Sequence, residues 1–279
     1  MKRVLSVQDI SCLGKCSLTV ALPVISAAGI ETAILPTAVL SVHTWFKSFT
    51  FHDLTDEISP ICQNWQEHDF GFDGIATGYL GSFRQIELVE EVFAMFDKPG
   101  MLKLVDPVLG DHGKFYVGFD NKFAKRMGQL CGKADVIVPN LTEASFMLGE
   151  EYKNGHYDEK KIQELLKRLA DLGCPNVVLT GVTYEKGKYG VAAWNAEKGE
   201  YSTYFGEEQP GTFHGTGDLF SAALFAALIS GQQMHKALET AVEFTVESIR
   251  KTLETPDHIP YGVEFERAIP LLLRKLELI

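Results

Sequence analysis

The sequence predicts an α/β protein with a mainly parallel central sheet and helices on both of its faces. Apolar, strand-like runs alternate with helix-like runs over most of the 279 residues, and the connections between them are short. Several of the strand-like runs are apolar throughout, as in sheets that are covered on both faces. No low-complexity tract or internal repeat interrupts the pattern, so we expect one domain over residues 1–279.

Start and stop residues delimit the elements expected in the first half of the chain. Ser17 is a typical N-cap residue and Gly29 a typical helix stop, so a helix is expected between them. The Lys-Pro-Gly run at 98–100 ends another helix, and Pro107 ends a strand because proline cannot donate to a sheet. We expect strands over 4–8, 32–36, 74–77 and 102–105, and helices over 17–28, 52–67 and 83–96.

The second half continues the alternation and then becomes helical. Gly173 stops an amphipathic helix, and the Glu-Lys-Gly turn at 197–199 separates two runs typical of a hairpin. From residue 217 onward the chain is expected to be mostly helical, with breaks at Pro256 and Pro260. We expect strands over 135–138, 176–180, 188–195 and 200–205, and helices over 142–148 and 160–172.

Charge, cysteine usage and hydropathy restrict the classes of partner. The net charge of −11 disfavours a general nucleic-acid or anionic-membrane surface, although local N–H groups or Mg²⁺ still allow phosphate binding. The five cysteines are scattered and odd in number, which favours free thiols over disulfides. No secretory h-region opens the chain and no apolar run approaches the roughly 20 residues that span a bilayer, so a cytoplasmic location is expected.

The carboxyl ends of the predicted strands mark the expected site, because ligands of parallel α/β sheets bind there. Five strand ends pass from apolar residues to polar residues or glycine, at 8–9, 77–79, 106–107, 139–140 and 180–181. We therefore expect the functional residues to gather along this edge of the sheet.

The turn Gly215-Thr216-Gly217-Asp218 leads straight into a long apolar run, which predicts a loop followed by a buried helix. Free N–H groups in the first turn of such a helix, together with its dipole, make an anion site. Asp218 would repel an anion there, and two explanations for it remain open. It is either a base that accepts a proton from a hydroxyl attacking a phosphate, or an N-cap carboxylate of a core helix.

Three oxygen-bearing residues beside neighbouring strand ends suit Mg²⁺. Asp106, Asn140 and Glu143 are hard ligands that bind this ion directly or through water. The two acids also have simpler explanations: Asp106 belongs to an Asp-Pro turn, and Glu143 lies in the first turn of a helix, where the dipole favours an acid.

Other polar and aromatic residues are candidates for an acceptor pocket. Tyr79 either stacks on a flat ligand or caps the core, and His43, beside Thr44, is either a pocket residue or a structural histidine. The glycine-rich stretch 111–118 follows the Asp106 turn and is either a mobile cover or a surface loop. The sequence contains no P-loop, protein-kinase motif, nucleophile elbow or dinucleotide fingerprint.

Taken in order, these motifs resemble the ribokinase-like superfamily of small-molecule kinases, and within it the pyridoxal (vitamin B6) kinases. The most specific mark is the Gly-x-Gly-Asp turn at 215–218, and the match spans nearly the whole chain. The resemblance implies a ribokinase-like three-layer sandwich. The other matching motifs are the opening strand 4–8, Ser41-Val42-His43-Thr44, Gly78-Tyr79-Leu80-Gly81-Ser82, Asp106-Pro107-Val108-Leu109-Gly110 and Pro139-Asn140-Leu141-Thr142-Glu143.

The resemblance also implies an activity, which is the ATP-dependent phosphorylation of the 5′-hydroxymethyl group of pyridoxal, pyridoxamine or pyridoxine. Asp218 would be the base, and Gly215, Thr216 and Gly217 would form the anion hole for the transferring phosphoryl group. The remaining residues fall into a nucleotide group and an acceptor group. ATP would contact Asp106, Asn140, Glu143 and Thr180, with Mg²⁺ on Asp106 and Glu143 partly through water, and Asp9, His43, Thr44 and Tyr79 would hold the pyridine ring.

The family likeness further implies a homodimer that uses ATP and Mg²⁺ and closes residues 111–118 as a lid, while the need for a monovalent cation stays open. One departure concerns the substrate, because pyridoxal kinases usually carry a serine where this chain has Asp9. A carboxylate pairs with a protonated pyridine nitrogen more strongly than a hydroxyl does. Asp9 is also similar to the Asp-x-Ser beginning of hydroxymethylpyrimidine kinases.

Two alternatives to a B6 kinase therefore remain. A hydroxymethylpyrimidine kinase of the thiamin pathway is favoured by Asp9, whereas Thr44 and the motif 78–82 favour a B6 vitamer. A non-catalytic protein that binds a nucleotide or vitamin is disfavoured by the presence of Asp218, although a fold alone never establishes activity.

Overall fold

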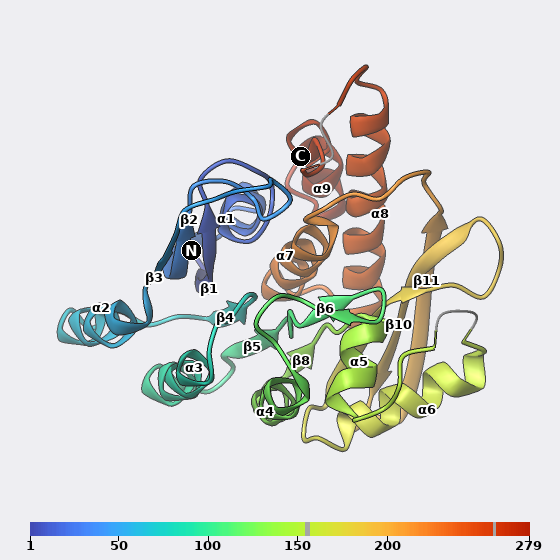
Figure 1. The fold of residues 1–279 in the computed structure, drawn as a ribbon. Helices are drawn as coiled ribbons and strands as arrows, with labels where there is room; N and C mark the ends of the chain where they lie inside the picture. The colour runs from blue at the N-terminus through green and yellow to red at the C-terminus, as the bar shows by residue number, and fades with distance from the viewer. Residues whose placement is uncertain (154–156, 259–260) are drawn as a thin grey trace.

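A mixed sheet of nine strands forms the middle layer of the computed structural model, which describes residues 1–153, 157–258 and 261–279 (Figure 1). These strands are β1 (Arg3–Ser11), β2 (Glu31–Leu40), β3 (Phe51–Asp53), β4 (Gly74–Thr77), β5 (Leu102–Val105), β8 (Val136–Ile137), β9 (Asn176–Val182), β10 (Lys188–Asn195) and β11 (Glu200–Glu207). Their order is β11-β10-β9-β8-β5-β4-β1-β2-β3. The strands from β9 to β2 pair in parallel, while β3, β10 and β11 pair antiparallel at the two edges.

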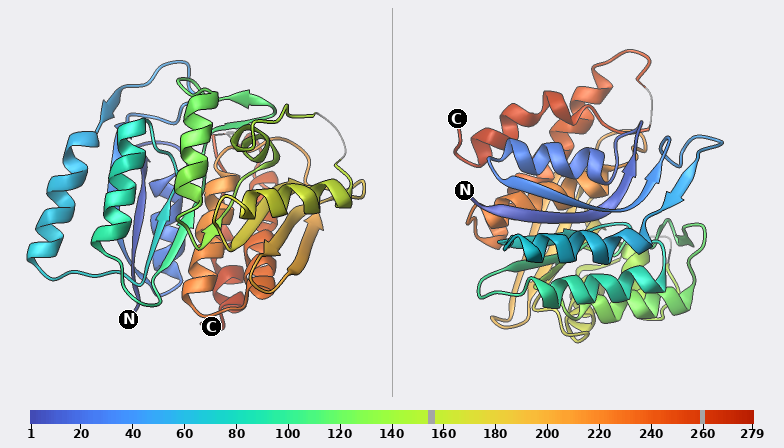
Figure 2. Two further views of the ribbon diagram at one scale, coloured as in Figure 1. Left: turned by 90° about the horizontal axis from the view of Figure 1, so that it is seen from below. Right: turned by 90° about the vertical axis from the view of Figure 1, so that its left-hand side faces the viewer.

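Helices cover both faces of this sheet, which confirms the expected three-layer class (Figure 2). One face carries α1 (Leu18–Ala27), α7 (Thr216–Ile229), α8 (Met234–Leu253), the 3₁₀ turn η1 (Phe265–Arg267) and α9 (Ile269–Lys275). The other carries α2 (Thr55–Glu67), α3 (Phe83–Met95), α4 (Asn121–Cys131), α5 (Leu141–Met147) and α6 (Glu159–Ala170). A small separate hairpin, β6 (Gly110–Asp111) and β7 (Lys114–Phe115), follows β5.

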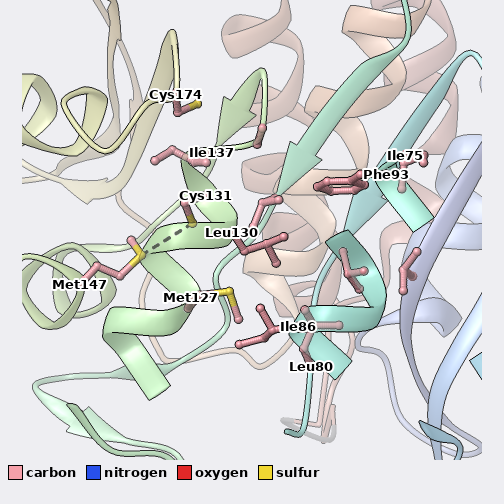
Figure 3. Packing of buried hydrophobic residues seen from close by; sticks show 14 of the residues in the cluster. Ile75, Leu80, Ile86, Phe93, Met127, Leu130, Cys131, Ile137, Met147 and Cys174 are labelled. Carbon is pink, nitrogen blue, oxygen red and sulfur yellow. Dashed lines mark hydrogen bonds between the residues drawn. The ribbon is translucent and has the colours of Figure 1, made fainter. Parts of the chain in front are cut away.

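The two cores follow from the alternation of side chains along each strand. In β5, Val105 packs into the core under α2–α6, and its neighbour Leu104 packs into the core under α1, α7 and α8. Figure 3 shows part of the first core, where the sulfur atoms of Cys131 and Met147 lie 3.7 Å apart. All five cysteines are free, as the sequence predicts.

Several predicted boundaries are wrong. The helix expected over 52–67 starts later, because residues 51–53 pair antiparallel with β2 and α2 begins at Thr55. The first two strands extend beyond 4–8 and 32–36, since their mutual pairing continues as far as Ser11 and Leu40. Helix α4 and the hairpin β6–β7 are additions that the prediction lacks.

The helical C-terminal part agrees with the prediction where the structure describes it. Helix α8 ends at Leu253, which confirms the break near Pro256, and Pro260 lies outside the described residues. Within the described ranges, no helix combines the length and the apolar character needed to cross a membrane.

Candidate functional site

The carboxyl edge of the sheet brings the predicted phosphate-binding residues together. Because β4, β5 and β8 are neighbours, Thr77, Asp106 and Asn140 lie along one edge. Helix α7 packs against this edge, where the Ser221 hydroxyl donates a 2.6 Å hydrogen bond to Oδ2 of Asp106. Asp218 lies nearly one turn before Ser221, and both line the same small cavity as Asp106.

The start of α7 has the geometry of an anion site. Gly215 is the N-cap in a left-handed conformation with φ 72°, and a Cβ there would lie 1.9 Å from the carbonyl oxygen of Lys15. The first intrahelical hydrogen bond runs from Leu219 N–H to Gly215 O, so the N–H groups of 216–218 have no acceptor within the helix. Since Gly215 is the N-cap, the alternative of Asp218 as an N-cap carboxylate is wrong.

The surroundings of Asp218 favour a base that works near neutral pH. Removal from water, together with the charges of Asp106 and Asp9, raises the pKa of Asp218 to about 7, although a backbone hydrogen bond from Ser17 opposes the shift. Ser17 is the N-cap of α1, and its φ of 49° is unusual for a residue with a side chain. A carboxyl group with a pKa near 7 can both accept and release a proton at that pH.

Asn140 and Glu143 form a capping box at the start of α5. The Asn140 side chain accepts hydrogen bonds from the backbone N–H groups of Thr142 and Glu143, at 2.8 and 2.9 Å. Glu143 accepts from Asn140 N–H at 2.8 Å and from Leu109 N–H at 3.1 Å. The capping explanation of Glu143 is therefore confirmed, and its second hydrogen bond also ties α5 to the segment after β5.

The two buried acids at this edge have the chemistry that a divalent cation needs. Burial raises the pKa of Asp106 to about 6, and burial together with the Asp106 charge raises the pKa of Glu143 well above its usual value. A shared cation relieves both effects. Both Glu143 oxygens accept backbone N–H groups, which suits water-mediated binding. In the parts of the chain described, no group of three or more His, Cys, Asp or Glu side chains is arranged so that it could hold a metal ion by itself.

Thr180 lies beside Asn140, as predicted. The two residues form an isolated parallel bridge, and the Thr180 backbone N–H donates to Pro139 O at 2.9 Å. A groove of about 300 Å³ opens next to them, lined in part by Asn140, Gly181 and Tyr189. This groove leaves room for a ligand at the ends of β8 and β9.

Asp9 and Tyr79 lie near Asp218 on the other side of the edge. Asp9 is 6% exposed and occupies the place where the register between β1 and β2 shifts. Burial raises its pKa, and the side chains of Ser17 and Ser11 donate hydrogen bonds that oppose this shift. The Asp9 charge in turn raises the pKa values of Asp218 and Tyr79, so the three groups are close in space.

His43 is a buried residue whose ring faces a second histidine. The backbone N–H of Trp45 donates to His43 Nδ1 at 2.9 Å, and the ring centroids of His43 and His214 lie 5.1 Å apart. Burial and His214 lower the pKa of His43 to about 4, so it is neutral at pH 7. Thr44 is exposed, and the hydrogen bonds found between described residues do not include its side chain.

Two residues of the site were not predicted. His214 directly precedes the Gly215 turn, and Tyr116 lies within the candidate lid 111–118, part of which forms the hairpin β6–β7. Tyr116 is 45% exposed, yet partial desolvation and the charges of Glu143, Asp111, Asp218 and Asp106 raise its pKa, so its hydroxyl lies on the side of the hairpin that faces these acids. The only signal for these two residues in the sequence is that each lies next to, or within, a segment that the sequence analysis had singled out.

Fold and site together define a class of protein: an α/β protein in which a helix N-terminus and buried acids meet at the carboxyl edge of a parallel sheet, as in enzymes that bind phosphates. The model of the phosphomethylpyrimidine kinase family matches residues 22–261, and the chain belongs to this family.

Three relatives show where within the family the likeness lies. A putative phosphomethylpyrimidine kinase of Bacteroides thetaiotaomicron, crystallised with pyridoxal, is 38% identical, with a TM-score of 0.92 over 97% of this chain and 95% of that one. The pyridoxal kinase of Lactobacillus plantarum is 29% identical, with a TM-score of 0.89 over 98% and 97%. The hydroxymethylpyrimidine/phosphomethylpyrimidine kinase of Haemophilus influenzae is 28% identical over 67% of this chain and 68% of its own. The resemblance to pyridoxal kinases is confirmed.

Proposed function

We propose that this chain is an ATP-dependent kinase of B6 vitamers, which phosphorylates the 5′-hydroxymethyl group of pyridoxal, pyridoxamine or pyridoxine. The observation that carries the proposal is Asp218, a carboxyl group with a pKa of about 7 in the first turn of a helix whose leading N–H groups have no acceptor within the helix. The choice of acceptor is supported by the likeness to a pyridoxal kinase, which covers 98% of this chain.

The reaction follows from the placement of these groups. Asp218 accepts the proton of the 5′-hydroxyl as its oxygen bonds to the γ-phosphorus and the bond to the ADP oxygen breaks. The N–H groups of Gly215, Thr216 and Gly217 stabilise charge on the transferring phosphoryl oxygens. Asp106 and Glu143 would hold Mg²⁺, partly through water, and the bound ion would supply positive charge against the phosphates. Asn140 and Thr180 contact the nucleotide from the ends of β8 and β9.

The acceptor ring lies against the other group of residues. Asp9 pairs with the protonated pyridine nitrogen, and Tyr79 covers a face of the ring. Neutral His43 has its Nδ1 occupied by Trp45 N–H, so its proton is on Nε2, which donates to an oxygen of the vitamer. Thr44 contacts the vitamer from the exposed rim of the pocket.

A substrate panel with one active-site variant tests this proposal. Purified protein with Mg-ATP is given pyridoxal, pyridoxamine, pyridoxine and hydroxymethylpyrimidine, and product formation is measured. Asp218→Asn should lower turnover by about 10²-fold or more and leave ligand binding largely intact. Asp56→Asn, which changes an exposed aspartate on α2, is the matched control and should act like the unmodified chain.

Two results would overturn parts of the proposal. Hydroxymethylpyrimidine turning over far faster than every B6 vitamer would favour the thiamin-pathway alternative. Unchanged turnover in Asp218→Asn would remove Asp218 as the base, and binding of vitamin and nucleotide without any turnover would favour a non-catalytic protein.

The single domain, the homodimer, the cytoplasmic location and the lid stay predictions within this proposal. The homodimer is supported by three aromatic residues near the edge strand β3: Trp45, Phe49 and Phe51 are 45%, 44% and 48% exposed. Sedimentation equilibrium checks it, and the mass of one chain at assay concentration would contradict it.

A further inference from the structure

A buried glutamine joins four segments of the chain beside the candidate acceptor pocket. Gln85 lies in the first turn of α3 and is 1% exposed. Its Oε1 accepts a hydrogen bond from Gly81 N–H at 2.7 Å. Its Nε2 donates to Thr37 O and Thr55 Oγ1, both at 3.0 Å, and to Asp53 Oδ2 at 3.3 Å. Both ends of the amide are therefore paired, and a buried polar network satisfied in this way fixes the segments that it joins.

This network holds the short segment that carries Tyr79. Gln85 binds the N–H of Gly81 directly. The Thr37 hydroxyl donates to Tyr79 O at 3.1 Å, and the Thr37 carbonyl oxygen is itself held by Gln85. The Tyr79 ring folds back over the same segment, because a Cβ at Gly81 would lie 3.2 Å from the tyrosine hydroxyl oxygen. A shift of the Gln85 side chain should therefore move the backbone and the ring of Tyr79 together.

The Tyr79 ring faces groups whose spacing decides how a flat acceptor can lie. Burial raises the pKa of Tyr79, and the charges of Asp9 and Asp53 add to this effect, so both carboxylates lie near the tyrosine hydroxyl. The ring centroid of Phe119, which follows the candidate lid, lies 5.8 Å from that of Tyr79. The orientation of this ring therefore sets the space that is left for an acceptor beside Asp9.

Capping of α3 alone does not explain the contacts of Gln85. The run 82–85 has the Ser-x-x-Gln spacing of a capping box, in which the glutamine side chain accepts from the N–H of the N-cap residue. The Ser82 side chain does accept from Gln85 N–H, at 3.1 Å. The Gln85 oxygen, however, binds the N–H of Gly81, one residue before the N-cap, and its amide nitrogen reaches β2, β3 and α2. The side chain therefore also fixes the segment that precedes the helix.

We propose that Gln85 is a positioning residue for the acceptor, which fixes Tyr79 against a face of the pyridine ring through Gly81 and Thr37. A group held in place before its ligand arrives loses less freedom on binding, so the effect should appear in the affinity for the acceptor. The proposed base and anion hole lie on α7, so kcat and the affinity for ATP should depend little on this network. The inference rests on the proposed function in that it takes Tyr79 as part of the acceptor pocket.

Gln85→Met tests the inference because it keeps the length of the side chain and removes its hydrogen bonds. The Kd for pyridoxal, measured by isothermal titration calorimetry without ATP, should rise about tenfold. KM for the vitamers should rise by a similar factor, with kcat within about threefold and KM for ATP within about twofold of the parent. Thr37→Val removes only the hydroxyl bound to Tyr79 O, so it is a milder second variant and should raise this Kd about threefold. Thr37→Ser should restore the affinity.

A double-mutant cycle with Tyr79→Ala separates positioning from a general loss of stability. If Gln85 acts through Tyr79, Gln85→Met should raise Kd by less than about twofold in the Tyr79→Ala background. Gln232→Met is the matched control, because Gln232 lies beyond the opposite end of α7 from the site. It loses hydrogen bonds to Lys275 O and from Thr240, and it should leave Kd and both KM values unchanged.

Three results would overturn the inference: unchanged pyridoxal affinity in both Gln85→Met and Thr37→Val, an undiminished loss in the Tyr79→Ala background, or equal rises in KM for vitamer and ATP. Absence of turnover in the parent would contradict the proposed function instead, and the calorimetric cycle would still test Gln85. If the parent does not bind pyridoxal either, crystal structures of the parent and a variant decide. Positioning predicts a displaced Tyr79 ring in the variant, and an unmoved ring would overturn it.

Discussion

The two halves of the candidate site are built differently. The phosphate side consists of Asp106, Asn140, Glu143 and the turn 215–218, and the acceptor side consists of Asp9, His43, Thr44 and Tyr79. The phosphate side uses the ends of strands and the first turns of α5 and α7, where a capping box and free N–H groups fix its geometry. The acceptor side depends on a register shift in β1 and on the irregular segment 41–50, much of which is exposed.

This difference teaches where chemistry and specificity are encoded. Helix termini and strand ends of a packed sheet have few alternative conformations, so the groups that bind phosphate are fixed by the fold itself. Loop residues such as Thr44 can be substituted without disturbing the core, and the choice of acceptor can change with them. Changes on the phosphate side should therefore affect turnover and stability for every acceptor, and changes on the acceptor side should affect the choice among acceptors.

The largest effect is expected from Gly215→Ala. A Cβ at Gly215 would meet the carbonyl oxygen of Lys15 at 1.9 Å, and the φ of 72° is unfavourable for alanine, so the start of α7 must move. We expect a loss of about 10³-fold in kcat with every acceptor, because displaced N–H groups no longer meet the phosphoryl oxygens.

Gly217→Ala is the matched control for this substitution. A Cβ at Gly217 meets nothing within 4 Å, and its N–H is kept, so kcat should stay within about tenfold of the parent. Steady-state kinetics with two acceptors measure both variants. Equal losses in the two would show that the left-handed turn at Gly215 has no special part in the phosphate side.

The next effect is a pH dependence of stability that belongs to Asp218. Its pKa is about 7 in the folded chain against an ordinary value of 3.8, so between these values the folded state binds more protons than the unfolded state. Stability therefore falls as the pH rises from about 4 to about 7, by on the order of 2–3 kcal/mol after allowance for the partial exposure of the side chain. The stability of Asp218→Asn should lack this part of the pH dependence. The variant should therefore become more stable relative to the parent as the pH rises toward 7.

Urea unfolding of both chains at several pH values, in the presence of a chelator, measures the difference. Parallel stability curves for the two chains would mean that Asp218 titrates normally in the folded protein. That result would contradict the comparison between the two sides, because the phosphate side would then have no base whose pKa is raised by the fold.

The same contrast separates what the sequence predicts from what it does not. Asp106, Asn140 and Asp218 could be predicted because an apolar run ends just before the first two and begins just after the third, and a strand or helix terminus is visible as such a change in composition. Ser221 and His214 could not, because their roles depend on packing between α7 and distant segments. Ser221 is the single polar residue in the apolar run 219–229, but the sequence does not show that its hydroxyl contacts Asp106.

The fold shows a similar division. The buried central strands are continuous apolar runs and were predicted, whereas β3 carries the polar residues His52 and Asp53 at the sheet edge and resembles the start of a helix. Helix α4 did leave a signal, since Phe123, Met127 and Leu130 recur at helical spacing. Its polar residues masked this short amphipathic pattern.

On the acceptor side, Asp9→Ser should change substrate affinity and leave turnover nearly intact. The serine hydroxyl of the variant cannot make the charge-assisted contact that the Asp9 carboxylate makes with a protonated pyridine nitrogen. KM for pyridoxal should therefore rise about tenfold, while kcat stays within about threefold. Kinetics below neutral pH, where the ring is protonated, measure the change. A lower KM for pyridoxal together with the loss of hydroxymethylpyrimidine turnover would assign Asp9 to the pyrimidine instead.

The smallest effect is expected from Asn140→Ala, which removes the cap of α5 and leaves the acceptor side untouched. The backbone N–H groups of Thr142 and Glu143 lose their acceptor, and the hydrogen bond from Asn140 Nδ2 to Gly110 O is also lost. Stability should fall by about 1 kcal/mol, the usual cost of an N-cap. Because Asn140 also faces the nucleotide groove, KM for ATP should rise while KM for the vitamer stays constant. Asn140→Ser restores a cap and should recover the stability but only part of the ATP affinity, since its shorter side chain does not reach Gly110. Equal shifts in both KM values would mean that the two sides are coupled through α5, and the division between them would fail.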